Sequence, residues 1–349
     1  MNRFEWARLL ALAPALWLAT GWSAQAADRK VYVANEASGT VSVIDGSSFK
    51  PLTAIVVGSG PHNVQASPDG QRVWVTNNGL PQHATDHAAH TQASAGGHGA
   101  MATAGEVWAI DTASDQVVAR VTVGRHPAHV VLSADGRLAY VTNGGDNTLS
   151  VVDTTALKVV DTLPTGGFPH GIRLSPDGAQ AYVANLKDGT VSVFDTRSRK
   201  EIDRIAVGKG PAQVGFSPDG KQAFVSLSQE GQIAFIDPVG RKLVRKVRVG
   251  QVPIQLYATP DSRSLLVANQ GQRQKPGQTV SVIDLATHRN VATIRTGAGA
   301  HGVAIGTDGR YAFVSNVYAN TVSVIDIQAR KTVATVPVGG EPNGITVAP

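Results

Sequence analysis

The sequence contains no cysteine. This absence excludes disulfide bonds, a thiolate nucleophile, cysteine-ligated zinc and haem attached through a Cys-x-x-Cys-His motif. It also excludes a lipid-modified N-terminal cysteine. Any bound metal must therefore be held by other side chains, and an exported form of the chain would carry no lipid anchor.

Basic clusters and aromatic platforms are also missing. Aromatic residues make up 5% of the chain, and the formal net charge of +5 comes from scattered Lys and Arg. A nucleic-acid surface needs clustered basic residues and usually aromatic side chains for base stacking. We therefore expect no nucleic-acid partner.

Long apolar runs are confined to the N-terminus. Arg3 and Arg8 form a basic segment, Leu9 to Leu18 is almost entirely apolar, and residues 24–26 form an Ala-x-Ala cleavage signal. This pattern predicts a secretory signal peptide over residues 1–26. The alternative is an uncleaved membrane anchor, but the apolar stretch is short and Pro14 interrupts it. The mature chain, 27–349, should therefore be a periplasmic or secreted monomer without a membrane anchor.

A strand–turn–strand unit repeats seven times. Four of the six intervals between first-strand copies are 42 residues, one is 66 and one is 47. The first-strand copies begin at Val31, Val73, Ala139, Ala181, Ala223, Leu265 and Ala312, and the following strands end in Asp45, Asp111, Asp153, Asp195, Asp237, Asp284 and Asp326. A fixed period of about 40 residues built from short strands is typical of a propeller. Each repeated Asp most simply caps the turn that follows it.

The repeat resembles the YVTN-type β-propeller family over the whole mature chain. The resemblance is carried by 31–35 (Val-Tyr-Val-Ala-Asn), 73–77 (Val-Trp-Val-Thr-Asn), 139–143 (Ala-Tyr-Val-Thr-Asn) and the Ser-Pro-Asp-Gly turns such as 67–70. It implies an all-β propeller of four-stranded blades. It implies no single activity, because such propellers host many functions.

Blade arithmetic predicts how the ring closes. The chain begins with a second strand at Val31 and ends with an innermost strand, Gly344 to Ala348, that has no partner after it. The last strand should therefore complete the first blade, which gives seven blades and leaves no open edge. The connection into each innermost strand and the turn between the second and third strands then share one face, which we call the top face.

One top-face turn is much longer than the others. Residues 78–105 of the second blade are rich in Ala, Gly and His and have little apolar bulk. We expect a mobile insertion loop. It contains His83, His87, His90 and His98, and short His-rich tracts are a recognised metal-binding composition.

A second group of histidines begins the innermost strands. His62, His170 and His301 occupy the same position of their repeats, and His129 sits one position later. The second, third and fourth blades are neighbours, so His62, His129 and His170 can converge near the axis. The one-residue difference leaves open whether His129 points to the axis or to a blade interface. We hypothesise that the loop folds over this group and that both clusters form one metal site.

Three functions remain open. The favoured hypothesis is an exported, non-catalytic protein that binds copper or zinc through the eight histidines of the two clusters. The second is a lactonase- or lyase-type enzyme with a channel metal, because residues 126–130 (His-Pro-Ala-His-Val) resemble a turn of lactonase-type propellers. The third is a scaffold for a periplasmic protein partner or for a cofactor such as a d1-type haem, as in related propellers.

Overall fold

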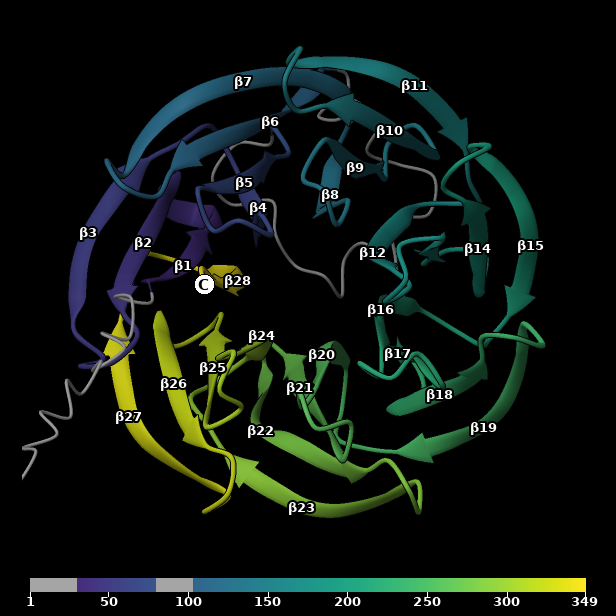
Figure 1. Ribbon diagram of the computed structural model, residues 1–349. Helices are drawn as coiled ribbons and strands as arrows, with labels where there is room; N and C mark the ends of the chain where they lie inside the picture. The colour runs from purple at the N-terminus through teal and green to yellow at the C-terminus, as the bar shows by residue number, and fades with distance from the viewer. Residues whose placement is uncertain (1–29, 80–102) are drawn as a thin grey trace, which may run out of the picture.

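The computed structural model describes residues 30–79 and 103–349. Within these residues the chain forms seven four-stranded antiparallel sheets arranged as blades around a central axis (Figure 1). The predicted seven-bladed propeller is therefore confirmed. The predicted signal peptide (1–26) and His83, His87, His90 and His98 lie outside the described residues.

Six blades run outward from the axis in the order of the chain, and in the first blade the last strand of the chain is innermost. The innermost strands are β28 (Pro342–Val347), β4 (Pro61–Ala66), β8 (Pro127–Leu132), β12 (Pro169–Leu174), β16 (Pro211–Phe216), β20 (Pro253–Ala258) and β24 (Ala300–Ile305). The second strands are β1 (Lys30–Asn35), β5 (Arg72–Asn77), β9 (Leu138–Asn143), β13 (Gln180–Asn185), β17 (Ala223–Leu227), β21 (Ser264–Gln272) and β25 (Tyr311–Asn316).

The third and outer strands complete the blades. The third strands are β2 (Thr40–Asp45), β6 (Ala104–Asp111), β10 (Thr148–Asp153), β14 (Thr190–Asp195), β18 (Gln232–Asp237), β22 (Lys275–Asp284) and β26 (Thr321–Asp326). The outer strands are β3 (Pro51–Val56), β7 (Gln116–Arg125), β11 (Lys158–Pro164), β15 (Lys200–Ala206), β19 (Lys242–Arg248), β23 (Arg289–Arg295) and β27 (Lys331–Pro337). The described residues add a 3-10 turn, η1 (Glu36–Ser38), and none of their helical segments is long and apolar enough to cross a membrane.

The C-terminal strand closes the ring, as the blade arithmetic predicts. β28 pairs antiparallel with β1, with Val31 opposite Val347 and Val33 opposite Ile345. The first blade therefore combines strands from the two ends of the chain, and the inner edge of β1 is paired rather than open.

Every innermost strand carries a β-bulge near its start. In blade 2, Pro61 pairs with Asn77 but Val64 pairs with Val75, so two residues of β4 lie opposite the single Thr76. The same shift occurs in the other six blades. A bulge re-aims side chains that strict alternation would send to opposite faces.

Hydroxyl side chains join neighbouring blades at these bulges. Thr142 Oγ1 accepts a hydrogen bond from the His129 amide at 3.0 Å and donates to the carbonyl of His170 in the next blade at 2.6 Å. Three other blades repeat the bond to the next blade: Thr76 to the Ala128 carbonyl, Ser226 to the Ile254 carbonyl and Ser315 to the Asn343 carbonyl.

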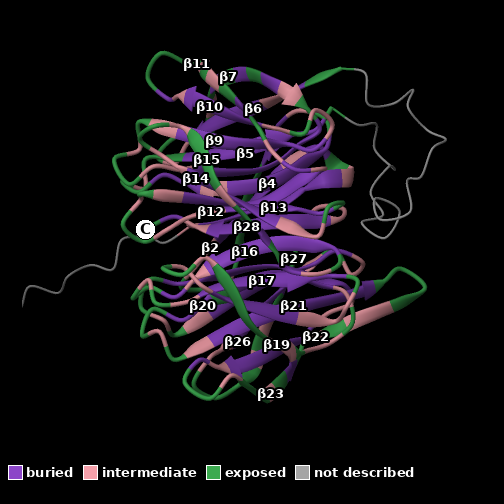
Figure 2. Ribbon diagram, turned by 90° about the vertical axis from the view of Figure 1, so that its right-hand side faces the viewer, coloured by how far each residue is buried: buried purple, intermediate pink, exposed green. Residues whose placement is uncertain are grey.

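The core lies between blades rather than at the axis. One cluster packs Tyr32, Val41 and Val43 of blade 1 against Val64 and Val75 of blade 2. Both faces of the inner strands are therefore covered, while the outer strands and turns are the exposed parts (Figure 2).

The strand-ending aspartates cap their turns, as the sequence predicts. Asp45 Oδ1 accepts hydrogen bonds from the backbone amides of Ser47 and Ser48. These bonds, with the Ser48 hydroxyl, lower the pKa of Asp45 below its usual value. The repeated Asp is therefore structural.

Replacing Thr142 with Val should lower stability markedly. Val keeps the shape but leaves the His129 amide and the His170 carbonyl without their buried partner. Each orphaned group costs about 1–3 kcal/mol, so we expect a loss of ~2–4 kcal/mol in urea unfolding. Thr162→Val, at an exposed position of β11 in the same blade, should stay within ~0.5 kcal/mol of the wild type. Equal effects of the two substitutions would contradict this role of Thr142.

Candidate functional site

Three buried imidazoles meet at the top end of the channel. His62, His129 and His170 come from the neighbouring strands β4, β8 and β12, and one ring nitrogen of each lies within 4.8 Å of the others. Their ring centroids are 4.9 to 5.8 Å apart, and all three side chains are at most 2% exposed. The bulges explain why His129, one position later in its repeat, still faces the axis rather than a blade interface.

The partners of His170 leave one nitrogen available. His170 Nδ1 lies 2.9 Å from the Ala212 carbonyl, which can only accept a hydrogen bond. The ring proton is therefore on Nδ1, and Nε2 presents its lone pair to His62 Nε2, 3.3 Å away. Either a proton on His62 or a cation must lie between these two nitrogens.

A buried carboxylate stands behind His62. Glu36, in η1, is 2% exposed, and its oxygens lie 3.4 and 3.5 Å from His62 Nδ1. The carboxylate also accepts hydrogen bonds from the side-chain amides of Asn78 and Asn343. No Lys or Arg within the described ranges pairs with it. With its proton on Nδ1, His62 donates to Glu36 and turns Nε2 toward the cluster as a ligand.

Asn343 can stabilise the other tautomer of His62. Its Nδ2 lies 3.1 Å from His62 Nδ1. If His62 carries its proton on Nε2, Nδ1 accepts from Asn343 and Nε2 donates to His170. The His62–His170 pair therefore satisfies its hydrogen bonds when the proton is on His62 Nε2, and the same two nitrogens face each other as ligands for a cation when it is on Nδ1.

His129 is held in the tautomer that is less favourable for binding a metal through Nε2. Gln213 Nε2 lies 3.3 Å from His129 Nδ1, and the amide is oriented by the bond from the Val214 amide to Gln213 Oε1. His129 therefore accepts at Nδ1, and its Nε2 has no hydrogen-bond partner in the part of the chain that the structure describes. Ligation through Nε2 would require the Gln213 amide to turn over. An orphaned buried nitrogen directed at two imidazoles is the feature that fits a missing ligand or ion.

The spacing and charge state suit a transition-metal ion. Two nitrogens bound to tetrahedral zinc at 2.0–2.1 Å are about 3.3–3.4 Å apart, which matches the 3.3 Å between His62 and His170. Burial, followed by the nearby His170 and His62, holds the pKa of His129 well below its usual value. His129 is therefore neutral near pH 7, and neutral imidazole is the form that binds metals.

The remaining predicted histidines have different places. His301 is buried in the channel wall of blade 7, but among the described residues it is not part of the group within 4.8 Å. His126 lies in the turn before β8 and packs against Phe168, with ring centroids 5.3 Å apart. His288 lies in the turn before β23, on the face opposite the histidine cluster, where it bonds Gln222 and packs against Phe235.

The sequence analysis missed Glu36 and Gln213. A signal for Glu36 was present, because it directly follows the second strand at a position where no other blade has an acid. The equivalent residues are Asn78, Gly144, Leu186, Ser228, Gln270 and Val317. Gln213 has no comparable signal, because its role depends on the contact between blades 3 and 5.

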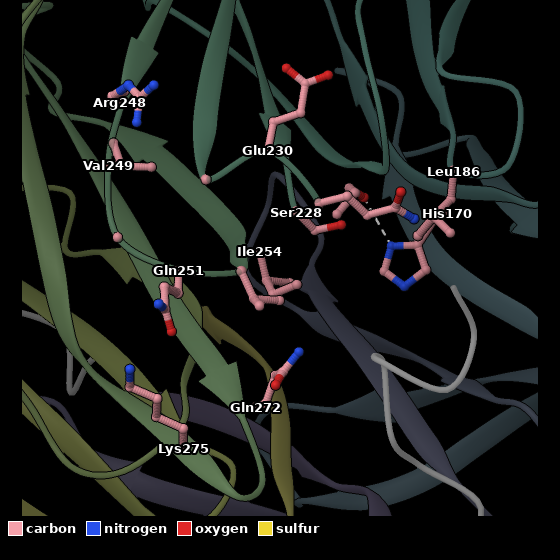
Figure 3. A pocket seen from close by; sticks show the side chains of 15 residues that line it. His170, Leu186, Ser228, Glu230, Arg248, Val249, Gln251, Ile254, Gln272 and Lys275 are labelled. Atoms are coloured by element: carbon pink, nitrogen blue, oxygen red, sulfur yellow. Dashed lines mark hydrogen bonds between the residues drawn. The ribbon is translucent and has the colours of Figure 1, made fainter. Parts of the chain in front are cut away.

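A pocket of about 660 Å³ adjoins the cluster on the top face. His170 lies at one side and the side chains of Arg248 and Lys275 at the other (Figure 3). Glu230 is neutralised by Lys246 at 2.8 Å, whereas Arg248 and Lys275 have no ion-pair partner within residues 30–79 and 103–349. The pocket therefore offers two unpaired cations beside the imidazoles.

Stability should fall in acid because of His301. Burial is the main cause that lowers the pKa of His301 to about 3, and His62 adds to it, while a bond to the Asn343 backbone opposes it. The unfolded chain, with a His pKa near 6.5, then binds more protons, so unfolding becomes easier as pH falls below about 6.5. From pH 6.5 to 4.5, His301→Gln should flatten the decline by up to ~1.4 kcal/mol per pH unit in urea titrations. An unchanged slope would refute this assignment.

Two family descriptions match parts of the chain. The model of the YNCE-like β-propeller matches residues 246–349, and that of the cytochrome D1 haem domain matches residues 102–260. No curated protein matches the sequence.

Solved structures share the fold over most of the chain. Kuenenia stuttgartiensis hydrazine synthase is 23% identical, with a TM-score of 0.68 over 83% of this chain and 90% of that one. The periplasmic gluconolactonase of Pseudomonas aeruginosa is 21% identical, with a TM-score of 0.68 over 92% and 99%. Dihydro-haem d1 dehydrogenase NirN, in complex with DHE, is 19% identical, with a TM-score of 0.63 over 88% of this chain and 63% of that one. The chain is thus a seven-bladed β-propeller, similar in parts to the YNCE-like and cytochrome D1 haem-domain propellers.

Proposed function

We propose that this chain is an exported, metal-dependent hydrolase of the lactonase class, with the metal held by His62, His129 and His170. The convergence of three buried imidazoles beside an open pocket carries the proposal. The likeness to a protein described as a gluconolactonase supports the reaction class. Membership of the YVTN-type family and periplasmic or secreted localisation are part of the same proposal.

Each part of the site has a role in this reaction. A bound zinc-type ion would polarise the lactone carbonyl or activate water. Glu36 accepts the His62 Nδ1 proton and keeps that imidazole oriented, and the Ala212 carbonyl does the same for His170. Arg248 and Lys275 favour a substrate that carries a negatively charged substituent, such as a phosphorylated or acidic sugar lactone.

A second candidate, tetrapyrrole binding, is supported by the match to the haem-domain family over residues 102–260. An axial ligand needs an imidazole nitrogen directed into an open pocket. His170 borders the pocket, but its Nδ1 is bonded to Ala212 and its Nε2 faces His62. This arrangement does not fit a macrocycle, so added haemin should give no ligation-shifted Soret band. A shifted band that disappears in His170→Ala would favour this candidate instead.

The metal site can be tested in a background where His83, His87, His90 and His98 are replaced by Ser. This background should bind one equivalent of zinc or copper, and His62→Ala or His170→Ala should weaken binding at least ~100-fold because a ligand is lost. His288→Ala, on the opposite face, should leave affinity unchanged. Hydrolysis of glucono- and 6-phosphoglucono-lactone should require the metal. Metal binding without hydrolysis of any lactone would favour the non-catalytic metal-binding hypothesis over a hydrolase. Absence of metal binding would refute the proposal.

The Glu36 carboxylate should tune metal affinity. Glu36→Gln keeps a hydrogen-bond acceptor beside His62 but removes the buried negative charge. We expect a ~10–100-fold weaker metal Kd, measured by chelator competition, with the fold retained by circular dichroism. Glu201→Gln, on the outer strand β15, is the matched control. If both variants bind metal like the wild type, Glu36 does not support the site.

A further inference from the structure

The opposite end of the channel holds a second cavity. It has a volume of about 260 Å³ and is bordered by Gln65, Arg173 and Tyr257. These are the fifth residues of β4, β12 and β20, whereas His62 and His170 are the second residues of β4 and β12. Three residues of strand separate the positions by about 10 Å, so the cavity is distinct from the histidine cluster.

Arg173 provides a charge without a counter-charge. Its Nη1 donates to Gln65 Oε1 at 3.2 Å, and its guanidinium lies 5.8 Å from the centre of the Tyr257 ring. No Asp or Glu in the described part of the chain pairs with it. Desolvation by burial lowers the pKa of Arg173, yet a guanidinium stays charged at neutral pH. Arg173 is half-buried, and its one side-chain hydrogen bond uses only part of its five N–H donors, so the guanidinium can bond further acceptors on a ligand.

The rest of the cavity suits a small anion. Tyr257 is partly exposed there, and its hydroxyl has no hydrogen-bond partner within residues 30–79 and 103–349. The other walls come from Ala66, Pro68, Val131, Leu132 and Leu174, which carry no charge. Arg173 is therefore the single formal charge that lines the cavity.

We infer that this cavity binds a small oxyanion, a carboxylate or phosphate, through a forked contact with Arg173 and a hydrogen bond from the Tyr257 hydroxyl. The planar guanidinium matches two oxygens of either group. The site does not depend on the proposed hydrolase activity, because none of its residues belongs to the histidine cluster or to the pocket beside it.

Calorimetric titration of the metal-free mature protein with inorganic phosphate, and separately with acetate, tests the inference. One saturable site tighter than about 10 mM is expected for at least one anion, and the tighter one identifies the ligand class. Arg173→Gln should weaken binding at least ~10-fold, and Tyr257→Phe several-fold. Arg197→Gln, an exposed arginine in the turn after β14, is the control and should bind like the wild type.

Two results would overturn the inference: no saturable binding of either anion by the wild type, or equal binding by Arg173→Gln. If Arg173→Gln does not fold, Tyr257→Phe decides, because it removes one hydroxyl and keeps the charge. Undiminished binding by Tyr257→Phe would then refute the site as described. Chelator is present throughout, so failure here leaves the proposed metal site untouched, and the reverse also holds.

Discussion

The extra residue near the start of every innermost strand decides which side chains reach the channel. Strict alternation would send positions two and three of these strands in opposite directions. The bulge places both opposite one residue of the second strand. In four blades that residue is a Thr or Ser that bonds the bulged amide and the next blade's carbonyl, as Thr76 does. His62, His129 and His170 converge only because of this constraint.

The convergence brings together imidazole nitrogens and a carboxylate that are destabilised by burial unless a proton or a cation lies between them. Two imidazole nitrogens face each other at 3.3 Å, a third has no partner among the described residues, and the Glu36 carboxylate is buried behind them. Burial keeps His129 neutral, so the cluster does not relieve this tension by protonating that ring. A metal ion would accept the lone pairs of His62 and His170, and that of His129 once the Gln213 amide turns over, and it would balance the carboxylate.

The channel is electrostatically asymmetric. Its top end combines three imidazoles with a carboxylate, and its other end presents Arg173, which has no acidic partner among the described residues. The similar structures carry different activities on the same fold, so the fold alone does not choose among them. The choice depends on the residues at the channel ends, and these support a cation at one end and an anion at the other.

The repeat pattern alone establishes the strands, the seven blades, the closure by the C-terminal strand and the capping role of the repeated Asp. These features depend on local periodicity and turn chemistry, which the sequence displays directly. It also predicts that eight histidines share the top face, and four of these (His62, His129, His170 and His301) lie in the described residues. Tertiary structure decides the rest: the bulge that turns His129 to the axis, the approach of Glu36 to His62, and the isolation of Arg173. Each depends on contacts between blades distant in the chain, and no local pattern specifies which side chains meet across the axis.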